Sequence, residues 1–172
     1  MKINWKKYLA ALGSILFFVL FDQGTKYLAD RFLNPANGGS DVVLLRGIFR
    51  LQYLENKGAA FGILQGKSML LILVSALVFL LICVLYYRLP QERRFAPLLA
   101  ICILIMSGAI GNFIDRMRFG HVIDFLYFEL IHFPIFNVAD IYVTCSAIAL
   151  IVLFLFYYKE EDLDRIFHHG SR

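Results

Sequence analysis

The chain has 172 residues, of which 60% are hydrophobic and only 17% are charged. Soluble domains are usually about 45–50% apolar and about 25% charged, and a fold of this length has too little interior to bury such an excess. The composition therefore excludes a disordered chain, a disulfide-stapled secreted domain and an ordinary cytosolic enzyme. The net charge of +4 is typical of basic loops beside anionic lipid and requires no nucleic acid partner.

Four apolar stretches are long enough to cross a bilayer, since one span needs about 20 residues. The first stretch follows a basic segment and resembles a signal peptide, but no cleavage site follows it, so we expect an uncleaved helix. Residues 69–87 and 95–114 contain no charge, and Asp140 is the only charge in the last stretch. We predict a single domain over residues 1–172, with spans at about 8–28, 69–87, 95–115 and 137–158.

The basic residues predict how these spans are oriented. Three lysines lie within the first seven residues, and Arg88, Arg93 and Arg94 lie in the short link between the second and third spans. By the positive-inside rule these segments are cytoplasmic. Both termini are then cytoplasmic, and two connections, roughly 29–67 and 116–136, lie on the outer side.

The two outer connections differ in character. Residues 49–53 alternate between apolar and polar side chains, which predicts a strand, and Gly58 and Gly62 bracket a second short extended piece. Residues 119–136 are unusually apolar, so we expect an interfacial helix or loop there. The predicted fold class is therefore an all-α polytopic membrane protein of four transmembrane helices, with a small β-sheet on its outer face.

Charged residues inside or beside a span are costly, so each needs a reason. In this chain they fall at the outer ends of the spans or in the second outer connection. They are Asp22, Lys26, Asp115, Arg116, Asp124 and Asp140. Six charged groups at one level of the bilayer indicate a functional site.

Several of these residues also have a structural explanation. Asp22 and Lys26 lie one helical turn apart and can neutralise each other, with Lys26 reaching for water. Arg116 ends a helix whose dipole favours a cation at that position. Asn137 and Asp140 have the spacing of a helix N-cap and a first-turn acid.

Asp124 lacks such an explanation, because the apolar run around it leaves an ionised carboxylate poorly solvated. Neither Asp124 nor Asp140 has an obvious cation partner, and a fold that brings the second outer connection against the last span would pair them. Adjacent carboxylates share one proton. The ionised member can activate a water, and the protonated member can polarise a carbonyl. The pair therefore predicts a peptide hydrolase that uses no metal and no cofactor.

Other schemes fit the sequence less well. The histidines do not form the H-E-x-x-H motif of zinc peptidases, and no G-x-S-x-G elbow surrounds Ser107. A small membrane transporter or proton relay is the main alternative, because such proteins also use intramembrane carboxylates. Transporters tend to place their charges near the midplane, in broken helices. An assembly scaffold is a third possibility, but it would not need Asp124 in an apolar loop.

Five short motifs occur in order along the chain. They are DQGTK at 22–26, NKGAAFG at 56–62, SGAIGNFIDR at 107–116, GHVIDF at 120–125 and FNVAD at 136–140. In these motifs and in its four-span layout, the chain closely resembles the bacterial lipoprotein signal peptidase family, also called signal peptidase II. The resemblance covers about residues 8–158. Residues 30–47 and the acidic tail, residues 159–172, lie outside the motifs.

The resemblance implies an aspartic endopeptidase of the bacterial inner membrane, with its active site near the outer face. Such an enzyme removes the signal peptide from a diacylglyceryl-modified prolipoprotein, just before the lipid-bearing cysteine. The resemblance implies that Asp124 and Asp140 are the catalytic pair. It implies contacts with substrate or inhibitor for Asn56, Asn112, Arg116 and Asn137, and supporting roles for Asp22, Lys26 and Asp115. It also implies a cyclic peptide inhibitor of the globomycin type, and we expect a monomer among membrane lipids.

Overall fold

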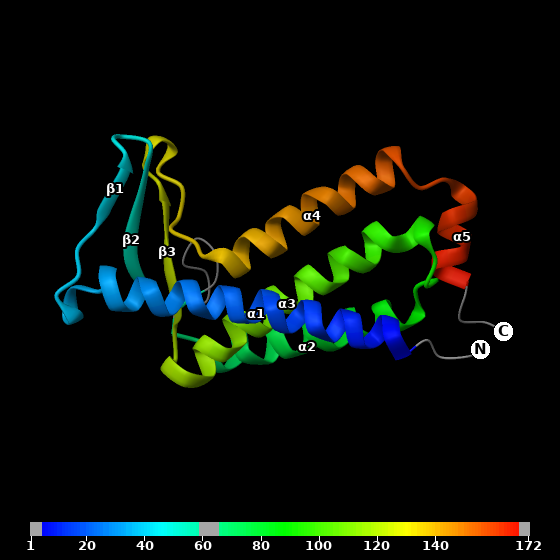
Figure 1. Cartoon of the computed structure of the whole chain (residues 1–172), viewed down its shortest axis with the longest axis horizontal. Coiled ribbons are helices and arrows are strands. Elements are labelled where there is room, and N and C mark those ends of the chain that lie inside the picture. Colours follow the sequence, from blue (N-terminus) through cyan, green and yellow to red (C-terminus); the bar gives the residue numbers. More distant parts are fainter. Residues whose placement is uncertain (1–4, 59–65, 169–172) are drawn as a thin grey trace.

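A computed structural model of the chain describes residues 5–58 and 66–168 (Figure 1). The long helices are α1 (Trp5–Leu33), α2 (Ser68–Arg88), α3 (Ala96–Phe119) and α4 (Val138–Phe156), and a short helix α5 (Glu160–His168) follows α4. The strands are β1 (Val42–Leu45), β2 (Phe49–Asn56) and β3 (Val122–Phe128). Short 3₁₀ turns lie at Pro35–Asn37, Arg93–Phe95 and Glu129–Ile131.

The long helices run lengthwise through the molecule, and the sheet lies across one end of them (Figure 1). Helix α5 lies at the opposite end, where α1 begins. We call these two ends the sheet end and the α5 end. Helix α3 packs against each of the other three long helices. Polar side chains on α3 near the sheet end can therefore contact groups from α1, from the sheet and from α4.

The four long helices are each long and apolar enough to cross a membrane. This finding confirms the predicted fold class of a four-helix membrane protein with a small sheet. Helix α1 has 29 residues and extends beyond the span expected at 8–28, and α3 continues to Phe119, beyond the span expected at 95–115. The extra turns carry polar and charged residues to the sheet end.

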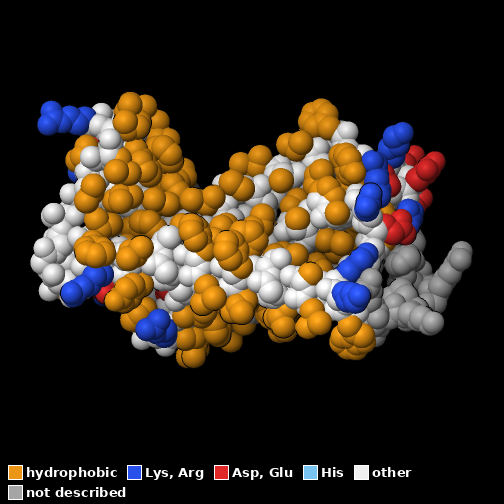
Figure 2. Space-filling model, viewed as in Figure 1, with side chains coloured by type: hydrophobic (Ala, Val, Ile, Leu, Met, Phe, Trp, Pro, Cys, Tyr) orange, Lys and Arg blue, Asp and Glu red, His pale blue; other side chains and the backbone are white. Residues whose placement is uncertain are grey.

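The outer surface of the helices is apolar. Helix α2, for example, exposes Leu73, Leu77 and Leu80 along its length. In Figure 2 hydrophobic side chains cover the middle of the molecule, and the charged side chains gather toward its two ends. An exposed apolar surface of this extent fits the hydrocarbon core of a bilayer. The chain is thus a multi-pass membrane protein.

The sheet is antiparallel in the order β1–β2–β3, so β2 is its central strand. The predicted strand at 49–53 is confirmed as part of β2. The second extended piece expected between Gly58 and Gly62 falls largely on residues outside the described part of the chain. The third strand comes instead from residues 122–128, where we expected an interfacial helix or loop. The first four residues of β3 are all buried, so the strand shows no alternation that would have revealed it.

A second set of backbone bonds ties the end of the apolar connection back onto β3. The N–H of Phe136 donates to the carbonyl of Leu126 (3.0 Å), and the N–H of Leu126 donates to the carbonyl of Phe136 (2.8 Å). Phe136 directly precedes Asn137, the N-cap residue of α4. These bonds therefore hold the start of α4 beside β3.

Helices α3 and α4 approach each other closely at Gly108. A Cβ atom placed on Gly108 would lie 2.7 Å from the carbonyl oxygen of Ala139 and 2.9 Å from Cγ2 of Val143. We expect Gly108→Ala to destabilise the protein by about 1–3 kcal/mol, because backbone must shift to admit the methyl group. Gly24→Ala, on α1, is the matched control because a Cβ there meets nothing within 4 Å. Thermal unfolding in detergent micelles checks this, and equal midpoints for the two variants would contradict it.

Candidate active site

Asp124 lies on β3 and is almost completely buried, with 1% of its surface exposed. Its carboxylate accepts hydrogen bonds from two side-chain amides. Nδ2 of Asn56, at the end of β2, donates to Oδ2 (2.8 Å), and Nδ2 of Asn137 donates to Oδ1 (2.6 Å). The sequence-predicted residues Asn56, Asn137 and Asp124 therefore meet at one point, although they come from three separate segments.

Asp140 lies in the first turn of α4 and forms a capping box with Asn137. The side chain of Asn137 accepts the N–H of Asp140 (3.0 Å), and Oδ2 of Asp140 accepts the N–H of Asn137 (3.2 Å). The structural explanation offered by the sequence is thus correct for this pair. It is not the whole role of Asp140, because Oδ1 accepts a further bond from Nδ2 of Asn112 on α3 (2.9 Å).

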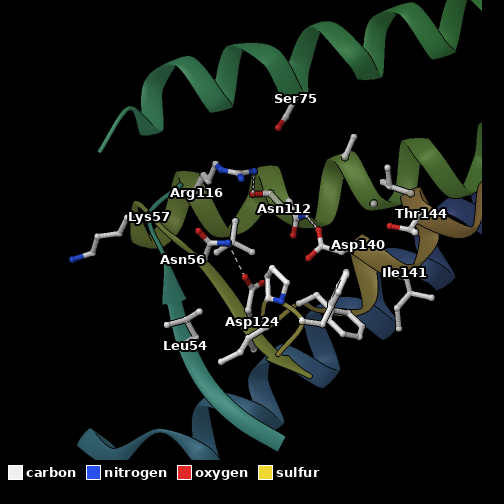
Figure 3. Close-up of a pocket in the computed structure, with 18 of the residues that line it drawn as sticks. Leu54, Asn56, Lys57, Ser75, Asn112, Arg116, Asp124, Asp140, Ile141 and Thr144 are labelled. Atoms are coloured by element: carbon white, nitrogen blue, oxygen red, sulfur yellow. Dashed lines mark hydrogen bonds between the residues drawn. The ribbon is translucent and has the colours of Figure 1, made fainter. Parts of the chain in front are cut away.

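The two carboxylates are joined by a chain of hydrogen bonds. Nδ2 of Asn137, already bonded to Asp124, also donates to Oδ1 of Asn112 (3.2 Å), and Asn112 donates to Asp140. Figure 3 shows Asp124 and Asp140 near one another on the wall of one pocket. Asp124 and Asp140 are 16 positions apart in the sequence. They come close together because the backbone bonds between Leu126 and Phe136 fold the segment between β3 and α4 back onto β3.

The pocket beside these carboxylates has a volume of about 920 Å³. Its walls come from β2 and β3, from one face each of α2 and α3, from residues 128–136 and from the first two turns of α4. Most of the lining is apolar, and it includes small side chains from three helices: Ser75 on α2, Ala109 on α3 and Thr144 on α4. Figure 3 labels Ser75 and Thr144 in this part of the pocket. An apolar pocket with a few convergent polar groups is the usual form of a binding site. Ser75 and the apolar part of the lining were not predicted, because nothing in their spacing distinguishes them from ordinary residues of a span.

Arg116, on α3, extends its guanidinium along the wall of the pocket (Figure 3). Its Nη1 donates to the carbonyl of Asn112 (3.4 Å), and Nη2 donates to the carbonyl of Gly58 (3.3 Å). A guanidinium has five N–H donors, so it can bind further carbonyl oxygens in the pocket. Arg116, which the sequence analysis placed as a cation at the end of a helix, therefore also faces the pocket.

Asp22, Lys26 and Asp115 form a buried ionic cluster behind the carboxylate pair. Nζ of Lys26 lies 3.0 Å from Oδ2 of Asp22 and 2.9 Å from Oδ2 of Asp115. The pairing of Asp22 with Lys26 agrees with the sequence prediction. The prediction that Lys26 reaches for water is wrong, because only 2% of its side chain is exposed. Gln23, overlooked in the sequence although it lies within the first motif, donates to Oδ1 of Asp115 (2.8 Å).

Burial and the neighbouring charge of Asp140 raise the pKa of Asp124 from 3.8 to about 7. The amides of Asn56 and Asn137 and the charge of Lys26 act in the opposite direction, but they do not outweigh the loss of solvation. Asp124 therefore holds a proton up to about neutral pH and can release it there. An acid with this pKa is suited to proton transfer.

These features first define a class: a multi-pass membrane protein with two adjacent carboxylates facing an apolar pocket. Comparison with known proteins then defines the family. The family model described as Signal peptidase (SPase) II matches residues 14–156, and the chain belongs to this family. It is therefore a peptidase and a hydrolase.

Individual relatives agree with this assignment. The chain is 42% identical over 147 residues to the lipoprotein signal peptidase of Caldanaerobacter subterraneus subsp. tengcongensis, a match covering 85% of this chain and 96% of the relative. It is 41% identical to that of Brevibacillus brevis, over 80% of this chain and 89% of the relative. A solved structure of a bacterial membrane enzyme has the same fold, with a TM-score of 0.73 and 28% identity over 88% of this chain and 92% of that one.

Proposed function

We propose that this chain removes the signal peptide from a diacylglyceryl-modified bacterial prolipoprotein, and that Asp124 and Asp140 are its catalytic acid and base. The observation that carries the proposal is that the amides of Asn137 and Asn112 link these two carboxylates by hydrogen bonds at one pocket. Family membership supports the substrate class, since the relatives are lipoprotein signal peptidases.

In the proposed mechanism Asp140 is the ionised member, since a negative charge is favoured in the first turn of a helix. It takes a proton from a water as the water oxygen attacks the scissile carbonyl carbon. Asp124 donates its proton to the carbonyl oxygen. The tetrahedral intermediate then collapses: the C–N bond breaks, Asp140 gives its proton to the leaving amine of the cysteine, and Asp124 takes back the proton of one hydroxyl group. Asn112 and Asn137 hold both carboxylates in place through these steps.

The proposed substrate fits the shape of the pocket. The signal peptide is an apolar helix, and the space between α2 and α4 is bordered by apolar and small side chains. Small residues let a second helix approach closely within a membrane. The donors of Arg116 suit the backbone carbonyls of an extended peptide near the cleavage site. A cyclic peptide inhibitor of the globomycin type would use the same donors.

We propose that the protein lies in the bacterial inner membrane as a monomer in contact with membrane lipids, with both termini in the cytoplasm. The α5 end carries the basic residues of the link between α2 and α3, such as Arg88 and Arg93, which favours a cytoplasmic location for that end. The sheet end, with the carboxylate pair, is then near the outer face. A lipid-modified precursor can reach this site sideways from the outer leaflet.

The proposal is tested with the full chain in lipid vesicles. A diacylglyceryl-modified prolipoprotein and the same precursor with an unmodified cysteine are supplied in parallel, with and without a metal chelator. We expect cleavage of the modified precursor alone, directly before the cysteine by mass spectrometry, at a rate that the chelator does not change. Absence of cleavage, or equal cleavage of both precursors, would overturn the proposal. The transporter alternative is not favoured, because the described parts of α2 and α3 are unbroken and the carboxylates lie at one end.

The pH dependence of cleavage follows from the raised pKa of Asp124. Below about pH 7 Asp124 carries the proton that the mechanism donates, and above it Asp124 is ionised and cannot donate. We expect the rate to fall about tenfold per pH unit on the alkaline side of a midpoint near 7. Asn56→Ala removes a bond that lowers this pKa, so its midpoint should move to higher pH. A midpoint that stays in place, measured as kcat/KM from pH 5 to 9, would contradict the assignment of the acid.

A further inference from the structure

Each acid of the ionic cluster contacts the backbone next to a catalytic aspartate. Oδ1 of Asp22 accepts the N–H of Ala139 (2.9 Å), the residue before Asp140. Oδ2 of Asp115 accepts the N–H of Ile123 (3.2 Å), the residue before Asp124. One ammonium, that of Lys26, lies between these two carboxylates. The cluster therefore links the backbones that carry the two catalytic groups.

Lys26 also determines which way the amide of Asn112 faces. Its Nζ donates to Oδ1 of Asn112 (2.9 Å), and this leaves Nδ2 to donate to Asp140 (2.9 Å). The reversed amide would place its two donors against an ammonium and its oxygen against a carboxylate. Both contacts would then be repulsive. The buried charge thus selects the one amide orientation that supports Asp140.

Close packing leaves the cluster little freedom to rearrange. A Cβ on Gly111 would collide with Oδ2 of Asp22, so the absence of a side chain there is what admits this carboxylate between α1 and α3. Asp22 has no exposed surface and Asp115 has 1%. Among the described residues that line the pocket, neither acid nor Lys26 occurs. The cluster therefore influences the site through residues that line the pocket, and it does not itself contact the substrate.

We propose that Lys26, held by Asp22 and Asp115, is a positioning residue. It fixes the orientation of the Asn112 amide and, through the two acids, holds the backbones of β3 and α4 in a fixed relative position. Asp124 and Asp140 are thereby kept in the arrangement that the reaction needs. The inference rests on the proposed function and deepens it. It assigns to a buried lysine an effect on the chemical step, without any contact with the peptide.

Simple removal of Lys26 would leave two buried carboxylates without a cation, which is strongly destabilising and can by itself prevent folding. The double variant Lys26→Met with Asp115→Asn avoids this problem, because it keeps the net charge of the cluster at one negative unit. The new amide oxygen at position 115 can still accept the N–H of Ile123. Lys26→Met with Asp22→Asn is the equivalent variant for the other acid, and it preserves an acceptor for Ala139.

Kinetics of the purified chain with the modified precursor test the inference. In either double variant we expect kcat per folded molecule to fall roughly a hundredfold, since displaced catalytic groups cost about this much. KM should change less than about threefold, because the pocket surface is unaltered. Asp162→Asn, which breaks the ion pair with Arg94 at the α5 end, is the control for reduced stability with unchanged kcat.

The outcomes separate this inference from the proposed function. If the intact chain does not cleave the precursor, the proposed function fails. If the intact chain cleaves and a folded double variant keeps its kcat within about threefold, the positioning role is overturned. The same holds if neither double variant folds, because Lys26 is then a folding residue. A rise in KM with unchanged kcat would also overturn it, since that result indicates a contribution to binding.

Discussion

Asp124→Asn and Asp140→Asn are each expected to lower the cleavage rate about 10³–10⁴-fold, because each removes a group that transfers a proton in the proposed reaction. An amide has nearly the shape of a carboxyl group, so the pocket should keep its form. The measurement is turnover of the diacylglyceryl-modified precursor per folded molecule. Asp41→Asn, at an exposed site whose carboxylate contacts Arg50, is the matched control and should leave turnover unchanged. Substantial activity in both site variants would eliminate the catalytic pair.

The two variants should differ in stability, and the difference tests the electrostatics of the site. The pKa of Asp124 is raised from 3.8 to about 7 in the folded protein. Between about pH 4 and 7 the unfolded chain therefore loses this proton more readily than the folded one, and the free energy of unfolding decreases as the pH rises. Asp124→Asn removes this destabilisation, so it should raise the midpoint of thermal unfolding at pH 8 but not at pH 4. Asp140→Asn weakens a capping box, which lowers the midpoint, but it also removes a charge that raises the pKa of Asp124, so its midpoint at pH 8 should lie below that of Asp124→Asn. The opposite order at pH 8 would contradict the structure-based argument.

The helices were predictable because lipid imposes a simple requirement on them. A stretch such as 69–87 must satisfy its backbone internally and expose apolar side chains, so length and lack of charge suffice to identify α2. The sheet was less predictable. β3 owes its conformation to pairing with β2 and to burial on both faces, and neither property appears in its local sequence. Only tertiary contacts distinguish such a segment from an interfacial loop.

The site shows the same division between local and tertiary information. The cap formed by Asn137 and Asp140 and the pairing of Asp22 with Lys26 follow helical spacing, so the sequence was sufficient for both. The third partner of the cluster, Asp115, lies on another helix, and no spacing rule connects it with Lys26. The order of the motifs identified the participants, but their contacts required the fold.

Asn137 is expected to have two separable roles, and two substitutions can separate them. Its side-chain oxygen caps α4, and its Nδ2 donates to Asp124. Asn137→Ser keeps a capping oxygen but loses the amide donor, whereas Asn137→Ala loses both. We expect kcat to fall roughly a hundredfold in both variants, because Asp124 loses its shortest bond.

Only Asn137→Ala should also lose stability, by about 0.5–2 kcal/mol, as expected for a missing N-cap. Thermal unfolding and turnover are measured on the same preparations, so that each effect is assigned to the same folded population. If Asn137→Ser keeps full turnover, the amide donor is dispensable and Asn137 serves only the helix. If both variants lose turnover and stability in parallel, the loss of activity reflects unfolding and the separate role at Asp124 is refuted. A catalytic loss shared by both variants, with a stability loss confined to one, would show that the helix cap and the support of the acid are distinct properties of one side chain.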